Sequence, residues 1–522
     1  MMGKQYDKQT QLFYPGFSLE KRIPSDHILR KICEQIEFNF AYDEVKEKYG
    51  TNGNVSVPPP IILKIMLLLI LYNVRSEREL MRSIALRLDW MWFLGYDLGD
   101  EIPNHSILSK ARKRWGVKVF KKLFERIVYQ CVKAGLVDGE KLFMDSSLIS
   151  ANASDNSVIN KDLLDKHFLE LESRLSGTGC YSIKEQNKKE ESKDNRKDDV
   201  KPEKKEGGVV GVNQKYVSTT DSEASIVRHG KGSAHLEYQV HRGVDGRSEV
   251  ITTTEVTPGS INEAHVLDQL IYTHERNTLT KVATVVADKK YGTIENYLYC
   301  YDKSIATHIK PLEKTQKDRG RRKDIFSKDQ FSYNKDTDSY TCPAGNHLTC
   351  RKFKKGRNHF EYRAAKKVCV KCQLKTQCTH DKIGRTLKRH IRQEELEIMY
   401  NKAYSQQSLS DLKTRQHLME RSFAQSVRYG FKKSRWRGLW RVQIQEYLTS
   451  SIQNIMILIN NKPYRILARR KRDEYIHFSE IKGGLEGIFQ YFHCLIHYLF
   501  SITHFISNYF MRIEFQPCKL GF

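Results

Sequence analysis

The stretch Val-Ala-Thr-Val-Val-Ala-Asp at 282–288 decides the fold class of this chain. Its unbroken run of small and β-branched apolar residues is typical of a central strand covered on both faces, and it ends in an acid, Asp288. A second stretch, Lys-Leu-Phe-Met-Asp-Ser-Ser at 141–147, also predicts a strand and carries Asp145 near its end. Catalytic groups in open α/β sheets gather at the carboxyl ends of strands, so we expect these two acids to converge. Taken singly, each acid could instead cap a helix or bond to a turn.

The sequence around these strands predicts a mixed sheet flanked by helices. Residues 237–259 indicate two further strands joined by a tight hairpin at Asp245-Gly246. Helical spacing returns after residue 395 and continues through a helix over 443–459. The predicted fold class is therefore α/β (mixed).

Residues 1–135 are predicted to form an all-helical module. A buried helix is expected after the three prolines at 58–60, and an amphipathic helix over 76–94 is expected to stop at Gly95. The segment 102–116 predicts a short capped helix with cations on its exposed side: Lys110, Arg112, Lys113 and Arg114. We interpret the module as DNA-binding, the alternative being a solvated basic helix face.

The charge of the whole chain supports a polyanionic partner. Lys and Arg number 88 against 62 Asp and Glu, which gives a net charge of +26 at pH 7. The excess lies in 351–390, 428–441 and 465–472, whereas acidic and basic residues nearly cancel in the charged tract near 184–208, which predicts a disordered loop. Such a surface favours nucleic acid, although a merely soluble surface is the simpler alternative.

The amino terminus has no secretory signal pattern, and the eleven cysteines are an odd number, unevenly distributed. Both observations predict a reducing cytoplasm, here that of a bacterium, with the protein on the nucleoid. The apolar stretch at 61–71 is too short to span a membrane, and the one at 488–511 contains Gln, His and Asn side chains. We therefore expect no membrane partner and an atypical hydrophobic tail.

Four strings, in this order, carry a specific resemblance. They are MDSS (144–147), HLEYQVHRGVDG with EVTPGSINEAH (235–265), ADKKYGTIENY (287–297) and ERSFAQSVRYGFKKSRWRGL (420–439). Together they resemble bacterial insertion-sequence transposases of the Asp-Asp-Glu (DDE) type, which have a ribonuclease-H-like core. The resemblance covers about residues 15–460 and includes a helical amino-terminal module and an insertion before the catalytic helix.

The resemblance implies a catalytic triad of Asp145, Asp288 and Glu420, which would hold Mg²⁺ or Mn²⁺. Two divalent ions about 4 Å apart need hard oxygen ligands, and carboxylates supply them. The implied partners are double-stranded DNA, both the terminal inverted repeats and the target, and a second copy of the chain in a homodimer on paired ends. The implied reaction is DNA cleavage followed by strand transfer.

The insertion contains a cluster of cysteines with metal-ligand spacing. Cys342, then Cys369 and Cys372 in a CxxC pair, and Cys378 resemble the insert of this transposase branch and predict a structural Zn²⁺. Cys350 is a fifth candidate. The alternative is a set of reduced, buried cysteines without metal.

Basic and aromatic residues around the third acid are candidate DNA contacts: Arg415, Arg428, Lys432, Lys433, Arg435, Trp436 and Arg437. Many relatives have Tyr, Arg and Lys seven before, four before and seven after the Glu. Here those offsets hold Lys413, Gln416 and Val427, with Arg415 and Arg428 one residue away.

The predicted domains follow these patterns. They are a helical DNA-binding module at 1–135, the first part of the core at 136–304, the basic cysteine-rich insertion at 305–395, the catalytic helix and end of the core at 396–470, and the hydrophobic tail at 471–522. A decayed or regulatory DNA-binding relative without catalysis is the main alternative function, and a metal-dependent nuclease without strand transfer is another.

Overall fold

The computed structural model describes residues 1–4, 18–51, 54–163, 166, 211–228, 230, 232–312 and 325–461. Residues Met1–Leu458 form one compact unit, and of the second unit, Ile459–Phe522, residues 459–461 are described. The charged tract expected to be disordered and the hydrophobic tail at 471–522 lie outside the described residues.

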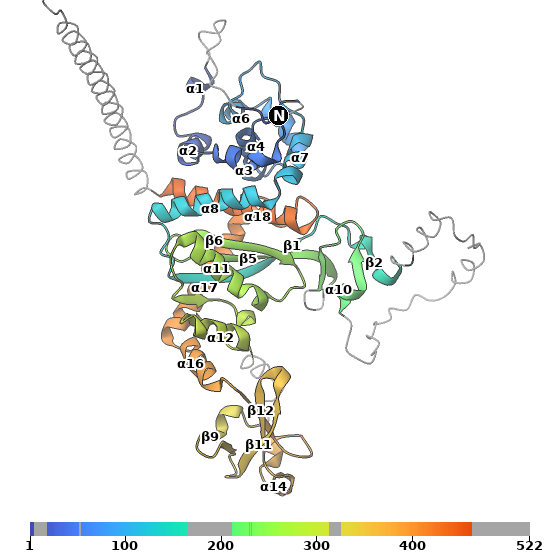
Figure 1. The fold of residues 1–522 in the computed structure, drawn as a ribbon, viewed down its shortest axis with the longest axis vertical. Coiled ribbons are helices and arrows are strands. Elements are labelled where there is room, and N and C mark those ends of the chain that lie inside the picture. The colour runs from blue at the N-terminus through green and yellow to red at the C-terminus, as the bar shows by residue number, and fades with distance from the viewer. Residues whose placement is uncertain are drawn as a thin grey trace, which may run out of the picture. The chain divides into compact units, whose positions relative to one another are not determined.

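The main sheet has the strand order of a ribonuclease-H-like core. Figure 1 shows its strands β1, β5 and β6 with helices α11 and α17 beside them. The strands are β1 (Lys141–Ser150), β4 (Ser225–Arg228), β5 (Ala234–Asp245), β6 (Ile251–Pro258), β7 (Thr284–Val286) and β8 (Ala306–His308). Strand β5 is antiparallel to both β1 and β6, whereas β7 is parallel to both β1 and β8. The order β6-β5-β1-β7-β8 therefore places β1 at the centre, and the fold is α/β (mixed), as predicted.

The hairpin between β5 and β6 forms where the sequence predicted it. The Asp245 carboxylate accepts the backbone N–H of Arg247 through Oδ1 at 2.9 Å and that of Gly139 through Oδ2 at 2.8 Å. A buried carboxylate with backbone donors is well satisfied, so this turn is fixed to the start of β1. Two short strands, β2 (Val158–Asn160) and β3 (Tyr216–Ser218), form a separate pair.

Helices cover both faces of the main sheet. Leu142 and Met144 of β1 pack with α11 (Leu267–Thr278) and α12 (Ile294–Asp302) on one face. On the other face, Ile149 packs in a cluster with Phe431 and with Val442 of α18 (Leu439–Asn460). Strand β1 thus packs on both faces of the sheet, with Leu142, Phe143 and Met144 buried before Asp145 and Ile149 buried after it.

The amino-terminal module is helical, as predicted. Its elements are α1 (Leu19–Arg22), α2 (Ile28–Gln35), α3 (Phe40–Val45), α4 (Pro59–Leu71), α5 (Glu77–Ile84), α6 (Leu88–Leu94), α7 (Ser106–Trp115) and α8 (Val117–Lys133). Pro59 opens α4, whose side chains are almost all buried. Helix α8 packs on α18, where the rings of Phe124 and Tyr447 lie 5.7 Å apart.

Two expectations for this module were wrong in detail. The segment 76–94 forms two helices rather than one, because the chain breaks at Arg87, whose extended backbone precedes α6. The Arg87 guanidinium lies over the rings of Tyr72 and Trp90 at 4.8 and 4.4 Å, and those contacts favour the break. Gly95 ends α6 as expected, with a φ of 77° that favours glycine.

Arg112, predicted to be exposed, is 3% exposed and paired with Glu77.

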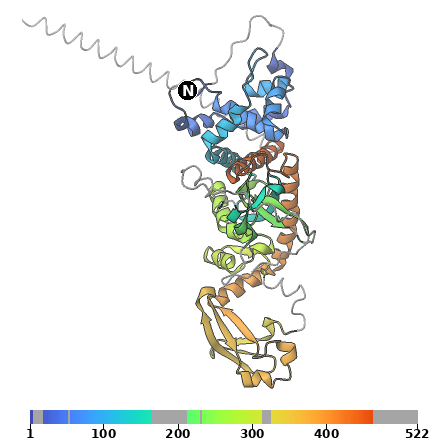
Figure 2. The ribbon, with the colours of Figure 1, turned by 90° about the vertical axis from the view of Figure 1, so that its right-hand side faces the viewer.

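The insertion forms its own antiparallel sheet (Figure 2). Its strand order is β13-β12-β11-β10-β9, and its core contains Tyr340, Leu348, Tyr362 and Leu387. The elements are β9 (Ser332–Asn334), β10 (Ser339–Thr341), β11 (His347–Lys354), β12 (His359–Arg363), α14 (Lys366–Val370), α15 (Lys375–Cys378) and β13 (Thr386–His390). The chain then returns to the main sheet through α16 (Gln393–Ala403) and α17 (Gln406–Val427).

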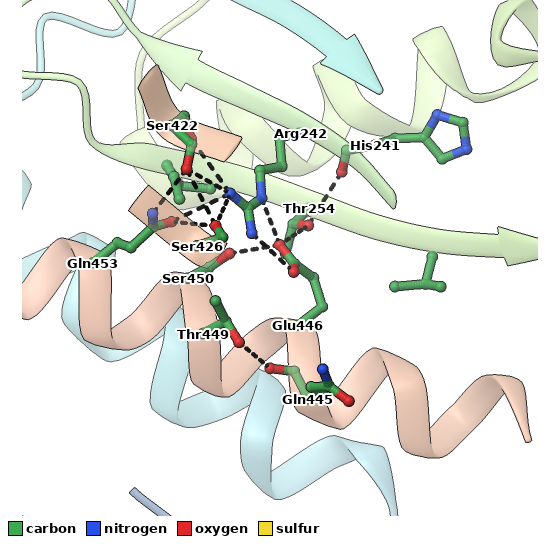
Figure 3. Close-up of polar contacts among 12 residues, drawn as sticks. His241, Arg242, Thr254, Ser422, Ser426, Gln445, Glu446, Thr449, Ser450 and Gln453 are labelled. Atoms are coloured by element: carbon green, nitrogen blue, oxygen red, sulfur yellow. Dashed lines mark hydrogen bonds and ion pairs between the residues drawn. The ribbon is translucent and has the colours of Figure 1, made fainter. Parts of the chain in front are cut away.

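A buried ion pair joins the last two helices to the sheet (Figure 3). The Arg242 side chain on β5 is fully buried and donates to both carboxylate oxygens of Glu446 on α18, at 2.7 and 2.9 Å. Its Nη1 also donates to the Ser426 hydroxyl of α17 at 2.7 Å and to the Gln453 Oε1 of α18 at 3.2 Å. A guanidinium satisfied this completely fixes α17 and α18 relative to β5.

Candidate active site

Asp145 and Asp288 occupy equivalent positions on neighbouring strands. Strands β1 and β7 are parallel, with Phe143 opposite Val286, and each acid lies two residues further along its strand direction. Neighbouring strands are about 4.8 Å apart, so continuation of this register sets the two carboxylates side by side. The Asp288 side chain makes no capping hydrogen bond to the following 3-10 helix (Lys289–Tyr291), so helix capping does not explain this acid.

The surroundings of Asp145 impose opposing effects on its charge. Burial raises the pKa of Asp145, and the negative charge of Asp288 adds to the rise. The Arg415 guanidinium and the backbone N–H of Ser146 act in the opposite direction. Arg415 Nη1 lies 2.6 Å from Asp145 Oδ2, and the Ser146 N–H donates to Oδ1 at 2.8 Å. The pKa stays raised overall, which is typical of a carboxylate pair that awaits a cation.

Helix α17 carries Arg415 across the sheet. Near its start, the Asp411 carboxylate lies 2.7 Å from Nδ1 of His308 on β8 and 3.0 Å from Nζ of Lys141 on β1. Further along, the Arg242 Nη1 on β5 donates to the backbone carbonyl of Ser422 at 3.3 Å. The helix therefore passes over β8, β1 and β5 in turn, and Arg415 is the residue that it places over Asp145.

Glu420 lies on the flank of α17 rather than on the side that faces the sheet. At 100° per residue it is rotated by about 140° from Arg415, and its Oε1 accepts a hydrogen bond from Gln416 Nε2 at 3.1 Å. The opposite flank carries Arg421, which pairs with Glu249 in the β5–β6 turn beside the start of β1. Glu420 is exposed, and the hydrogen bond that its carboxylate accepts comes from Gln416 on the same helix.

A fourth acid, which the sequence did not single out, lies beside the pair. Glu263 is 5% exposed and accepts hydrogen bonds from Lys290 Nζ at 2.6 Å and from Gln239 Nε2 at 2.8 Å. Gln239 Nε2 also donates to the Ser146 hydroxyl at 2.8 Å, next to Asp145. Glu263, together with Asp288 and Asp145, raises the pKa of Lys290, so this lysine keeps its charge at the edge of the site.

Both newly found groups sit in strings that carry the resemblance, Glu263 in EVTPGSINEAH and Lys290 in ADKKYG. The spacing of Glu263 and Lys290 from the two aspartates along the chain matches neither a helical nor a strand period. Periodicity in the sequence therefore does not predict that these residues lie together. The turn after β6 and the short 3-10 helix after β7 bring Glu263 and Lys290 to the two aspartates. A sequence reading could have found Lys290 from its place two residues after Asp288, but Glu263 had no such signal.

The candidate DNA contacts after α17 divide into two groups. Arg428, Lys432, Lys433 and Arg437 are exposed at the surface. Arg435 and Trp436 instead contact the helical module, because Arg435 Nη2 donates to Asn73 Oδ1 at 2.6 Å and Trp436 Nε1 donates to Glu77 Oε1 at 3.0 Å. Burial lowers the pKa of Arg435.

The Trp436 ring also stacks on the buried guanidinium of Arg112 in α7. The Arg112 guanidinium lies 4.0 Å from the centre of the Trp436 ring and pairs with Glu77 at 2.5 Å. These contacts join the helical module to the core. Arg435 and Trp436 therefore stabilise this junction.

Four cysteines of the insertion line one small cavity. Cys342, Cys369, Cys372 and Cys378 surround a space of about 30 Å³, whereas Cys350 is exposed and does not line it. Every described cysteine is free of disulfide bonds. Across the described ranges, no three His, Cys, Asp or Glu side chains stand in an arrangement that could hold a metal ion. Two carboxylates of the predicted triad are therefore aligned, and the four thiols line one cavity. Neither set has the arrangement of a complete metal-binding site.

Two family models match parts of the chain. A family model described as "Transposase domain (DUF772)" matches residues 17–114, and one described as "Transposase DDE domain" matches residues 341–459, a range that includes Glu420. Asp145 and Asp288 lie outside both matches. A search of the curated proteins found no match. Among the described helices, none is both long and apolar enough to cross a membrane.

One solved structure that matches is a "Mos1 transposase paired-end complex with left transposon end". It is 9% identical, the match covers 49% of this chain and 61% of that chain, and the TM-score is 0.15. The chain thus covers less than two thirds of that structure's chain, and a likeness this weak carries no argument about the fold. The two family models match segments before and after the strands of the main sheet, and over those two segments the chain is similar to DDE transposases.

Proposed function

We propose that the protein binds the terminal inverted repeats of an insertion sequence and catalyses metal-dependent cleavage and strand transfer of DNA. The observation that carries this proposal is the shared register of Asp145 and Asp288 on β1 and β7. Their carboxylates, with Glu420 from α17, would hold Mg²⁺ or Mn²⁺. Bound divalent ions would supply the activation of a water or a 3′-hydroxyl and the neutralisation of charge at the leaving oxygen.

The residues of the chain fit this role in their chemistry, and two side-chain contacts would have to change. Asp145 offers a partly exposed carboxylate, but one of its oxygens is occupied by Arg415. Glu420 would add its carboxylate from α17, but this carboxylate now accepts a hydrogen bond from Gln416. We infer that Arg415 leaves Asp145 for a DNA phosphate when the site is loaded, since a guanidinium binds phosphate as well as carboxylate.

The DNA partner would be held by the exposed cations near the site. Arg428, Lys432, Lys433 and Arg437 are exposed and follow the catalytic helix, where they can neutralise phosphates. Two transposon ends would be paired by a homodimer, and the protein would act on nucleoid DNA in the bacterial cytoplasm. The Arg435 and Trp436 side chains would support this surface indirectly, because they fix it to the helical module.

The test measures Mg²⁺-dependent cleavage and joining of a labelled duplex that contains the ends flanking the gene. Asp145→Asn, Asp288→Asn and Glu420→Gln should each lose cleavage by at least 10²-fold while DNA binding persists, because a bound metal needs every carboxylate. Glu295→Gln is the matched control: this glutamate is exposed in the first turn of α12, within the same core. It should retain native activity.

The decayed or regulatory relative remains the second candidate function. It is favoured by the absence of the usual Tyr, Arg and Lys around Glu420 and by the hydrogen bond that holds its carboxylate. Binding of the ends without cleavage by the native protein, in either Mg²⁺ or Mn²⁺, would establish this candidate. Cleavage without joining would instead indicate a metal-dependent nuclease.

We also propose a structural Zn²⁺ for the insertion, since four thiols that line one cavity form the donor set that zinc prefers. Metal analysis of the purified protein should give one zinc per chain. Cys369→Ser should lose that zinc and lower the unfolding temperature, whereas Cys350→Ser should keep it because Cys350 lies outside the cavity. A native protein without zinc would establish the alternative of reduced thiols.

A further inference from the structure

The hairpin of β11 and β12 in the insertion, here called the ribbon, has a free edge along β11. Strand β10 pairs with β11 only up to Ser339 opposite Thr349. Beyond that point β11 pairs with β12 alone, through Lys354 opposite His359, while β12 is covered on its other side by β13. The outer edge of β11 from residue 350 onward is therefore unpaired within the described part of the chain.

This ribbon is exposed on both faces. Every residue from 349 to 358 is exposed, although a strand over an apolar core normally buries alternate side chains. Phe353 is 43% exposed and stacks on Phe360 of β12, with ring centres 4.8 Å apart. The core of the insertion lies instead around Leu348 and Tyr362, at the other end of the hairpin. Phe360 is itself partly buried against that core, so Phe353 is the exposed member of the pair, and an exposed phenylalanine on a strand edge indicates a contact surface.

The charge of the ribbon is strongly positive. Its cations are Arg351, Lys352, Lys354, Lys355 and Arg357. None of the five forms an ion pair with a described residue, and the one acid of the hairpin, Glu361, pairs with His359 at 3.5 Å. Five uncompensated cations around an aromatic pair make a surface that attracts a polyanion.

Protection of a strand edge against self-association explains part of this pattern. Lysines on a free edge disfavour pairing with another strand, and Lys352 and Lys354 lie on that edge. This explanation does not account for Lys355 and Arg357, which lie in the turn beyond the strand, nor for the exposed Phe353.

We propose that the β11–β12 ribbon is a DNA-binding element that contacts the backbone of the duplex. The inference rests on the proposed function for its ligand, but not on the acidic triad. The cations on the free edge and in the turn would reach the phosphates of the duplex backbone. The Phe353–Phe360 pair would pack against the sugars between them. The ribbon thus adds a second DNA contact, on a different domain from the exposed cations after α17.

The test compares two triple variants of the full chain that remove equal charge from the same domain. The ribbon variant is Lys352→Gln, Lys354→Gln and Lys355→Gln, and the control is Lys366→Gln, Lys367→Gln and Lys371→Gln, three exposed lysines of α14 and its end. Binding to the end-containing duplex is measured from 50 to 300 mM NaCl. Thermal unfolding and Mg²⁺-dependent cleavage at saturating DNA and low salt are measured in parallel.

The ribbon variant should reduce the slope of log affinity against log salt by up to about 2.7, since each lost phosphate contact removes about 0.9. The control should keep the native slope, and both variants should keep native unfolding temperature and cleavage at saturating DNA. Equal slopes in all three proteins, or an equal reduction in both variants, would overturn the ribbon proposal while native cleavage still upheld the transposase. A native protein that binds no duplex would overturn both proposals together.

Discussion

At the scale of single residues, the site is governed by how its charges are compensated. Asp145 and Asp288 repel each other, and two cations on opposite faces of the sheet offset that repulsion. Arg415 approaches from α17, and Lys290 approaches from the turn after β7, held by Glu263. These two cations offset part of the negative charge of Asp145, Asp288 and Glu263, and any incoming cation has to compete with Arg415 for the Asp145 carboxylate.

Removal of that competitor should strengthen metal binding. We expect Arg415→Met to raise the affinity for Mn²⁺ on the order of tenfold, since loss of an interaction worth about 1.4 kcal/mol changes a binding constant tenfold. Calorimetric titration of Mn²⁺ at pH 8, without DNA, measures this. Arg421→Met is the matched control, because Arg421 also forms an ion pair from α17 but with Glu249, away from the acids. An unchanged affinity in Arg415→Met would contradict the competition.

His241 gives the β5 strand a stability that depends on pH. Burial lowers the pKa of His241 to about 4, while Nε2 bonds to the Thr257 hydroxyl at 2.9 Å. Its folded pKa lies below the unfolded value of about 6.5, so the stabilisation is present above pH 6.5 and is lost as the pH falls toward 4. Between pH 7 and pH 5 the native protein should lose about 2 kcal/mol that His241→Gln does not lose. Urea unfolding at the two pH values measures the difference, and parallel losses in the two proteins would contradict it.

At the scale of elements, the position of helix α17 depends on a charge buried in the sheet. Arg242 on β5 holds both α17 and α18, and Glu446 is its counter-ion. The orientation of α17, and with it the positions of Arg415 and Glu420, follows from this contact.

Removal of Arg242 alone should therefore lower the free energy of unfolding more than removal of both Arg242 and Glu446. Arg242→Met leaves Glu446 buried and unpaired, and should lower the free energy of unfolding by about 3–5 kcal/mol. The double variant Arg242→Met with Glu446→Met removes both charges and should recover most of that loss. Unfolding in urea, followed by tryptophan fluorescence, measures all three proteins. Equal destabilisation of the single and double variants would show that packing rather than charge sets the cost.

The sequence predicted the elements of the core better than their junctions. The apolar run before Asp288 and the Asp245-Gly246 turn are local signals, and the structure confirms both strands and the hairpin. The predicted helix over 76–94 failed because the stacking of Arg87 on two rings is a tertiary contact that no periodicity reveals. Glu263 and the Arg415–Asp145 contact were missed for the same reason, since turns and a helix crossing bring distant positions together.

At the scale of the whole molecule, polar and aromatic contacts around Trp436 add to the packing of α8 on α18 where the helical module meets the core. The Trp436 ring lies between Arg112 and Glu77 of the module, and Arg435 reaches Asn73. Residues first interpreted as DNA contacts thus include two that serve this junction. The roles of 435–436 and of the exposed cations around them can be separated by experiment.

Loss of the junction should expose the module to proteases without loss of its helices. Trp436→Ala should speed trypsin cleavage after Arg75, in the turn before α5, several-fold, since the backbone there loses its cover. Trp440→Ala is the control, because Trp440 stacks on Arg441 alone among the described cations. Digestion followed by mass spectrometry measures the rate, and equal rates in the two variants would contradict the junction role.

The contact between Arg242 and Glu446 also sets an order for synthesis. The arginine leaves the ribosome 204 residues before its counter-ion, so the centre of the sheet cannot be completed until almost the whole described chain has been translated. A premature stop codon anywhere in that interval yields a polypeptide with an unpaired guanidinium in its core. We expect such a product to be degraded rather than to persist on DNA, so nonsense mutations in this gene should behave as simple losses and not as dominant inhibitors of intact copies.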